Sequence, residues 1–418
     1  MGYAAPRGTA DILPKDSPRW RHLESIFREK CRLYGYEELR TPTFEETDLF
    51  TRSIGEHTDI VSKEMYEFKD RGDRSITLRP EGTAPVVRAY LQHNLQAESP
   101  VRKLYYITSI FRYERPQAGR YREHHQVGVE AIGSADPAID AEVISLGMDY
   151  LTSLGITKLD LKMNSVGCSA CRPGYRESLK RFVEPFIGEM CESCQTRYEA
   201  NPLRMLDCKV PQCRELTVHV PNIVDHLCDD CSAHLTSVLH YLDILGIEYH
   251  QDPRLVRGFD YYTKTAFEVQ SGELGAQSAV LGGGRYDGLV EEMGGKATPA
   301  VGFGSGIERA LAIMEAQKIE IPTDDHPTVF IVTLGDAPRE AGVKIIADLR
   351  RAGIPADIDY AGKSMKAQMR SADREHAEFA LIIGEDELAA GQVKLRNMHT
   401  KEEQDVATNV ILKAVEGS

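Results

Sequence analysis

Hydrophobic and polar positions alternate most regularly between residues 105 and 133, in two stretches joined by a polar loop. Successive side chains of a strand point to opposite sides, so this pattern predicts a β-hairpin. One face of the first strand carries Tyr106, Thr108, Ile110 and Arg112. The corresponding face of the second strand carries Gln126, Gly128, Glu130 and Ile132. Because Gly128 has no side chain, we expect an open polar floor between Gln126 and Glu130.

The loop between these strands is cationic, with arginines at positions 115, 120 and 122. Guanidinium groups bind phosphate through paired N–H donors, so the loop predicts a flexible flap suited to a phosphate group. A solvated hairpin with surface charges is the alternative interpretation. The positions of Arg112 and Glu130 disfavour a solvated hairpin, because both are predicted within strands, where an unpaired charge is costly.

The same reasoning predicts the elements around the hairpin. Apolar residues at helical spacing predict helices over residues 17–34, 84–95 and 139–154. Alternation predicts a strand approaching Pro42, a hairpin in which Tyr66 and Phe68 face Ile76 and Leu78, a strand over residues 159–164, and a strand pair over residues 254–269 and 279–289.

Glycines mark two further stretches. Gly282, Gly283 and Gly284 allow the close approach of a flat ligand such as an adenine ring. Residues 300–316 predict a glycine-rich strand that opens a helix bearing Arg309. A dinucleotide-binding fold is excluded, because this stretch lacks a βαβ unit and the acidic residue that should follow it.

A second unit is predicted after a linker at residues 319–328 that contains prolines and aspartates. Strands are expected over residues 329–334, 355–360, 379–384 and 392–398, and helices over residues 338–352, 363–376 and 402–415. This alternation is typical of a small α/β domain. One predicted helix face carries Lys363, Lys366, Arg370 and Arg374, which is either a solvated face or a contact for an RNA backbone.

Composition narrows the class of protein. The chain has 418 residues, 42% of them hydrophobic, and a net charge of −14, which argues against general affinity for nucleic acid. No apolar run is long enough to span a membrane, and the N-terminus has no secretory signal. We therefore expect a cytoplasmic protein.

Eight of the nine cysteines lie in four close pairs between Val166 and Leu235: Cys168 and Cys171, Cys191 and Cys194, Cys208 and Cys213, and Cys228 and Cys231. In a cytoplasmic chain these pairs favour two tetrahedral zinc sites over disulfides. The alternative is that the cysteines only pack the segment. If zinc is bound, its loss should loosen this segment without moving Arg112 or Glu130, so any chemistry at these two residues should largely survive.

Several of these stretches resemble sequence motifs of one enzyme family. The stretch FRYERPQAGRYREHHQ resembles motif 2 of class II aminoacyl-tRNA synthetases, Pro42 lies in a stretch similar to motif 1, and residues 300–316 resemble motif 3. LRPEGT, RGFDYYT and GGGRYDGL are similar to blocks of the histidyl-tRNA synthetases. The resemblance covers nearly the whole chain and points to that family.

The resemblance implies a fold and a domain plan. Residues 1–320 would form an α+β catalytic domain with an antiparallel sheet flanked by helices, the class II synthetase fold, and an insertion at about residues 166–235. Residues 326–418 would form a small α/β anticodon-binding domain. The implied protein is a homodimer that uses ATP with Mg²⁺ to attach L-histidine to tRNA(His) and has no membrane association.

The resemblance also implies roles for individual residues. Arg112, Arg257 and Arg309 would be catalytic, and ATP would contact Arg112, Arg120 and Arg309. Histidine would contact Glu81, Thr83, Gln126, Glu130, Arg257, Tyr261, Tyr262 and Tyr286. Glu81 has an alternative role, as a charge at the start of the helix that follows it. The other function considered is a synthetase-like regulatory subunit of histidine biosynthesis, which would bind histidine without charging tRNA.

Overall fold

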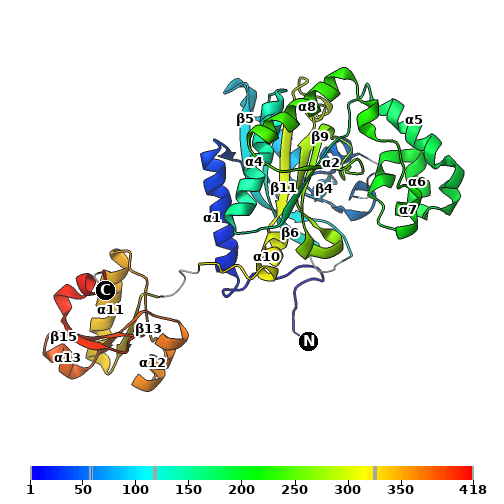
Figure 1. Ribbon diagram of the computed structural model, residues 1–418. Coiled ribbons are helices and arrows are strands. Elements are labelled where there is room, and N and C mark those ends of the chain that lie inside the picture. The colour runs from blue at the N-terminus through cyan, green and yellow to red at the C-terminus, as the bar shows by residue number, and fades with distance from the viewer. Residues whose placement is uncertain (1, 56–57, 59, 116–119, 323–326, 417–418) are drawn as a thin grey trace. The chain divides into compact units, whose positions relative to one another are not determined.

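The chain forms two compact units, Met1–Ile321 and Pro322–Ser418 (Figure 1). The structure is a computed structural model that describes residues 2–55, 58, 60–115, 120–322 and 327–416. Each unit has its own hydrophobic core. Among the described residues, no helix has the length and apolar character needed to cross a bilayer.

An eight-stranded sheet is the centre of the first unit. Its strands, in spatial order, are β1 (Glu37–Glu38), β5 (Arg102–Phe111), β6 (Glu123–Ile132), β11 (Ala300–Gly306), β10 (Ala279–Arg285), β9 (Thr263–Ser271), β7 (Leu159–Ser165) and β8 (His250–Gln251). The inner six strands are antiparallel, and the two short edge strands pair in parallel. The predicted hairpin is confirmed as β5 and β6, but Arg112, which was predicted within the first strand, follows the end of β5 at Phe111. The strand before Pro42 shrinks to the two residues of β1.

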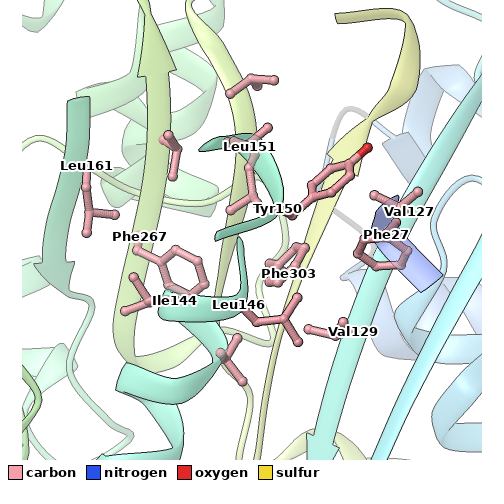
Figure 2. Close-up of a cluster of buried hydrophobic side chains, with 14 of the residues drawn as sticks. Phe27, Val127, Val129, Ile144, Leu146, Tyr150, Leu151, Leu161, Phe267 and Phe303 are labelled. Carbon is pink, nitrogen blue, oxygen red and sulfur yellow. The ribbon is translucent and has the colours of Figure 1, made fainter. Parts of the chain in front are cut away.

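Helices cover one face of this sheet and bury its apolar side chains. They are α1 (Ser17–Leu33), α4 (Pro137–Ser153), α8 (Asp229–Ile244) and α10 (Ile307–Ala316). Figure 2 shows the core between them, where Val127 and Val129 of β6 lie near Phe27, Tyr150 and Phe303. The odd-numbered positions of β6 therefore face the helices, and the even-numbered positions face the other side.

Smaller elements lie on that other side. A three-stranded sheet contains β2 (Phe44–Glu46), β4 (Ser75–Leu78) and β3 (Tyr66–Lys69), and the helices there are α2 (Thr47–Ile54), α3 (Thr83–Gln92) and α9 (Leu289–Glu292). Tyr66 pairs with Leu78 and Phe68 with Ile76, so the predicted hairpin of β3 and β4 is confirmed. A second hydrophobic cluster, formed by α3 and α9 with the sheet, borders the polar part of this face.

The cysteine-rich insertion between β7 and α8 is helical. It contains α5 (Arg172–Val183), α6 (Glu192–Ala200) and α7 (Pro211–Leu216), joined by short 3-10 turns. Tyr175, Leu179 and Val183 form one buried stripe along α5, and they pack with cysteines of the segment into a separate small core. Met190, Leu203, Met205 and Ile223 also contribute, so the insertion has a small hydrophobic core of its own.

The second unit is a sheet with helices, as predicted, but it has five strands where four were expected. The strand order is β13 (Ala356–Ile358), β12 (Val329–Thr333), β14 (Phe379–Ile383), β15 (Gln392–Asn397) and β16 (Glu403–Ala407), and the helices are α11 (Asp336–Arg351), α12 (Met365–Arg374), α13 (Glu385–Ala389) and α14 (Ile411–Glu416). The predicted basic stripe is exposed, although Lys363 precedes α12 and pairs with Asp359 at 3.4 Å.

The predicted helix over residues 402–415 is wrong in its first half. Residues 403–407 form β16, which pairs antiparallel with β15, and only Val406 of this strand is buried. The Asn397 side chain accepts hydrogen bonds from the backbone N–H groups of His399 and Thr400 at 2.9 and 3.0 Å, which closes a tight turn. This turn and the pairing with β15 override a composition that is otherwise compatible with a helix.

Candidate active site

The uncovered face of the central sheet combines polar side chains with glycines. Gln126 and Glu130 of β6 project from it, as predicted, and β11 runs beside them with Gly302 and Gly304. A side-chain carbon at Gly302 would lie 2.0 Å from Oε2 of Glu130, and one at Gly304 would lie 2.0 Å from Nε2 of Gln126. The glycines of the motif 3 strand are therefore required by the polar side chains of the motif 2 strand.

The floor between Gln126 and Glu130 is not open, contrary to the prediction. Tyr106 is paired with Gly128 across the two strands, and its ring fills the space that a side chain at Gly128 would need. The Tyr106 hydroxyl accepts from Gln126 Nε2 at 3.1 Å and donates to Glu130 Oε1 at 3.4 Å. Tyr106 thus connects the two predicted site residues, and the sequence analysis did not assign it to the site.

Glu130 is buried and surrounded by hydroxyl groups. Its side chain accepts from Thr83 Oγ1 at 2.8 Å, and from the hydroxyls of Tyr106 and Tyr286. Burial raises the pKa of this carboxyl to about 8, and the hydroxyl donors only partly offset that effect. A carboxyl held in this way can accept one further N–H donor, which is what a neutral imidazole offers.

Glu81 takes the helix-start role that was its alternative interpretation. Its carboxylate accepts from the backbone N–H groups of Thr83 and Ala84 at 2.6 and 2.7 Å, at the first turn of α3. Burial raises the pKa of Glu81 above its ordinary value. Glu81 also lines the cavity described below, so its position is compatible with both interpretations.

Arg257 lies in a loop and not in a strand. The strand predicted over residues 254–269 begins only at Thr263, because side chains of the preceding loop bond to the cysteine-rich insertion instead of continuing the sheet ladder. Arg257 Nη1 donates to Glu268 Oε2 at 2.7 Å. Although burial opposes its charge, Tyr262 and Glu268 keep the pKa of Arg257 above its ordinary value.

These side chains surround a cavity of about 180 Å³. Its lining includes every residue predicted to contact histidine except Glu130: Glu81, Thr83, Gln126, Arg257, Tyr261, Tyr262 and Tyr286. Glu130 bonds to Thr83 and Tyr286 of this lining. Arg112 also lines it, and its Nε donates to the Pro80 carbonyl at 2.8 Å. The structure therefore brings the predicted amino-acid site together.

The other predicted arginines line a neighbouring cavity of about 100 Å³, which also contains Arg112. Arg309 and Arg120 lie there with His124. Burial lowers the pKa of His124 to about 3, and the charges of Arg112 and Arg309 act in the same direction. Glu114 and Glu308 line the cavity as well, and Glu114 pairs with Arg120 at 2.9 Å. Three arginines against two carboxylates leave a net positive charge without a charged histidine, which suits a phosphate group.

The predicted adenine cradle is filled by the protein's own groups. The Arg257 guanidinium lies against Gly282, and the Tyr262 ring lies against Gly284. Gly283 approaches the carbonyl oxygen of Gly302 on the next strand. These glycines allow close packing of the loop onto the sheet, and Gly282 also lines the cavity of about 180 Å³.

The eight paired cysteines come together in two groups of four. One contains Cys168, Cys171, Cys228 and Cys231, and the other contains Cys191, Cys194, Cys208 and Cys213. In each group, the four sulfur atoms lie within 4.8 Å of one another. All are free thiols, and Cys31 is buried in the main core, as predicted.

Comparison with known proteins identifies the family. A family model described as histidyl-tRNA synthetase matches residues 8–170 and 209–310, and an anticodon binding domain model matches residues 328–417. The histidine–tRNA ligase of Caldanaerobacter subterraneus subsp. tengcongensis is 53% identical over 98% of this chain and 99% of that protein. The chain belongs to the histidyl-tRNA synthetase family. The histidine–tRNA ligase of Moorella thermoacetica is 54% identical to this synthetase over 97% of the chain and 96% of that protein.

Solved structures agree with the fold. The apo histidyl-tRNA synthetase of S. aureus matches this synthetase with a TM-score of 0.85 and 42% identity, over 99% of this chain and 100% of that one. A Bacillus halodurans protein, titled as an ATP phosphoribosyltransferase regulatory subunit or histidyl-tRNA synthetase, has a TM-score of 0.67 at 21% identity, over 92% and 99% of the two chains. That second likeness shows the fold alone. The expected class II fold is confirmed.

Proposed function

We propose that this synthetase activates L-histidine with ATP on the polar face of its central sheet and then transfers the histidyl group to the 3′ end of tRNA(His). The activity is that of a histidine–tRNA ligase, the activity of its family. One observation carries the assignment of the site: the cavity lined by the histidine candidates and the cavity lined by Arg120 and Arg309 share Arg112. A carboxylate in the first cavity can therefore meet a phosphate in the second.

Charge neutralisation is the main requirement of the first step. The histidine carboxylate attacks the α-phosphate of ATP, and pyrophosphate leaves, so negative charge builds up on the phosphate oxygens. Arg112 would hold the α-phosphate at the junction of the two cavities. Arg257 would contact both that phosphate and the histidine carboxylate. Arg309 and Arg120 would hold the outer phosphates.

Histidine would be selected by hydrogen bonding. A neutral imidazole has one N–H group and one bare nitrogen. Glu130 would accept from the N–H group, and the Tyr262 hydroxyl would donate to the bare nitrogen. Gln126, with Glu81 and Thr83, would orient the amino group and carboxylate of the substrate. A buried site of this kind rejects analogues that lack either partner.

Magnesium would arrive with ATP and be held mainly by phosphate oxygens. The carboxylates of Glu114 and Glu268 line the same groove as Arg112 and Arg309, so the donor set fits a hard cation beside the phosphates. The ion would neutralise the leaving pyrophosphate. A homodimer and a cytoplasmic location are further parts of the proposal and rest on family likeness.

The second unit would read the tRNA. Its match to an anticodon binding domain and its separate hydrophobic core support this role. Deleting residues 326–418 should abolish most tRNA charging but leave histidine-dependent pyrophosphate exchange, because the catalytic sheet has its own core. Full charging by the truncated protein would contradict the assignment. Loss of exchange in the full-length protein, with charging-competent tRNA and ATP present, would instead favour the regulatory-subunit alternative.

A further inference from the structure

The eight cysteines of the insertion join segments that are far apart in the sequence. The proximal quartet (Cys168, Cys171, Cys228 and Cys231) ties the start of the insertion to its end. The distal quartet (Cys191, Cys194, Cys208 and Cys213) ties α6 to the turn before α7 and to α7 itself. Together they form two cross-links in a segment that has only a small core of its own.

The sulfur positions match a tetrahedral metal site. Four thiolates at the usual Zn–S distance of about 2.3 Å lie about 3.8 Å from one another. In the proximal quartet, Cys168 Sγ lies 3.7 Å from Cys171 Sγ and 3.8 Å from Cys228 Sγ. In the distal quartet, Cys191 Sγ lies 3.8 Å from Cys208 Sγ. Each quartet thus has room for one ion and not for a metal cluster.

Backbone donors point at the sulfur atoms as well. The N–H of Cys168 lies 3.2 Å from Cys171 Sγ, and the N–H of Cys191 lies 3.2 Å from Cys213 Sγ. Such donors stabilise thiolates and fix their orientation around a metal. Cysteines that served only as small apolar residues would be buried, whereas Cys168, Cys171, Cys191 and Cys228 are partly exposed.

We propose that each quartet binds one Zn²⁺ ion, and that these ions position the loop of residues 254–262, which carries Arg257 and Tyr262. The second part of this proposal rests on the roles proposed above for those two residues. The first part does not, because zinc content is measured independently of activity. Zinc would act here as a structural ion with a closed set of four thiolate ligands.

The distal quartet borders the loop directly. Asn201 and Arg204 lie between Cys194 and Cys208. Asn201 Nδ2 donates to Asp260 Oδ1 at 2.8 Å, and Arg204 Nη1 donates to the carbonyl oxygen of Arg257 at 2.9 Å. These bonds hold both ends of the short stretch between Arg257 and Asp260.

Two further contacts hold the rest of the loop. Arg172, which follows Cys171 of the proximal quartet, donates to the carbonyl oxygens of Gly167 and Tyr262. Arg254 donates from the loop to Thr217 Oγ1 at 2.9 Å, beyond the distal quartet. The loop is therefore bonded to the insertion along its length.

This arrangement changes the expected effect of metal loss. Glu130 projects from β6, and Arg112 directly follows β5. Their side chains bond to Pro80, Thr83, Tyr106 and Tyr286, which lie outside the insertion. Arg257 and Tyr262 are held by it. Loss of zinc should therefore impair histidine activation through the loop, whereas the sequence analysis predicted that activation largely survives.

Zinc content is tested first, by elemental analysis of protein purified under reducing conditions without chelator. The expected result is two zinc ions per chain, one in Cys208→Ser, and two in the control Cys31→Ala, whose thiol lies in the main core. Less than about 0.2 zinc per chain in the wild type, or iron in place of zinc, would overturn the metal assignment.

The coupling to the loop is tested with variants that differ in zinc. Cys208→Ser lacks the distal ion, and Asn201→Ala keeps both ions but loses the bond to Asp260. Both should raise the KM for histidine in pyrophosphate exchange by on the order of 10-fold, with a smaller change in the KM for ATP. The matched control is Glu199→Gln, because Glu199 bonds Lys180 within the insertion and not the loop.

The outcomes separate the two parts of the proposal. Two zinc ions in wild type with unchanged histidine KM in both Cys208→Ser and Asn201→Ala would overturn the coupling and leave the metal sites standing. An equal rise in Glu199→Gln would also overturn it, since any disturbance of the insertion would then suffice. Should Cys208→Ser fail to fold, wild-type protein stripped of zinc by a chelator takes its place, and a histidine KM that stays unchanged after loss of the ions overturns the coupling.

Discussion

The side chains on the two faces of β6 differ in polarity and in the residues that they contact, although they come from one strand. Val127 and Val129 face the helices and are buried among apolar side chains. Gln126 and Glu130, one residue away in each case, face tyrosines, threonine and arginines. The apolar face stabilises the unit, and the polar face, where we propose the active site, has a cost in stability, because a buried carboxyl must be held by donors. Substitutions on the two faces should therefore have separable effects.

The largest effect is expected at Arg257, which lies above the polar face. Arg257→Ala should slow histidyl-adenylate formation by on the order of 10² or more, because it removes a preorganised cation from the transition state. Histidine binding should weaken less, since the imidazole contacts are made by other residues. The measurement is single-turnover adenylation at saturating substrates. A rate near that of the wild type would contradict the role of Arg257.

Glu130→Gln should separate stability from function. The pKa of Glu130 is about 8 in the folded protein, compared with 4.5 for an exposed carboxyl, so the folded state binds this proton more tightly than the unfolded chain. Its stabilising contribution is present at low pH. As the pH rises from about 4.5 to about 8, the free energy of unfolding falls by about 1.4 kcal/mol per pH unit. The glutamine variant should lack this pH dependence, because an amide does not titrate.

The same variant should lose activity. Glu130→Gln should weaken histidine activation by on the order of 10-fold or more, because an amide has one oxygen acceptor where the carboxyl has two, and its NH₂ group cannot accept from the imidazole N–H. The thermal unfolding midpoint and pyrophosphate exchange are measured between about pH 5 and pH 8. If Glu130→Gln keeps both the pH-dependent stability and the histidine KM of the wild type, Glu130 is not the group that titrates or that binds the imidazole.

Val129→Ala, on the apolar face, should have the smallest effect on the reaction. Removing two buried methyl groups beside Phe303 should lower the free energy of unfolding by about 2 kcal/mol. The adenylation rate at low temperature should stay within about 2-fold of the wild type, since the variant loses packing and no donor or charge. A large loss of rate in a folded Val129→Ala protein would show that the two faces are not independent.

Local patterns in the sequence predict much of this site. A period of two places Gln126 and Glu130 on one face of β6 without any knowledge of the partner strands. Gly302 and Gly304 can likewise be read from the sequence. The side chains that require glycine there, Glu130 and Gln126, lie on the neighbouring strand. Family resemblance supplied the roles of Arg257 and Tyr262, which no spacing rule would assign to a site.

Features that depend on long-range contacts were missed. The Tyr106 ring fills the floor because β5 and β6 pair in one register, and a shift of one residue would remove it. Asn201 meets Asp260 only after the insertion folds back onto the sheet. The strand at 403–407 forms because β15 offers an edge, against a local composition that also suits a helix. Each miss concerns a partner distant in the sequence.

A structure of the synthetase with a non-hydrolysable analogue of histidyl-adenylate tests the central claim most directly. The imidazole should lie within hydrogen-bond distance of Glu130 and Tyr262, about 3 Å, with the phosphate between Arg112 and Arg257. Tyr106 and Gln126 of the central sheet should form the floor of the cavity that holds the analogue. An analogue bound elsewhere, or an imidazole that reaches neither Glu130 nor Tyr262, would contradict the assignment of the polar face as the active site.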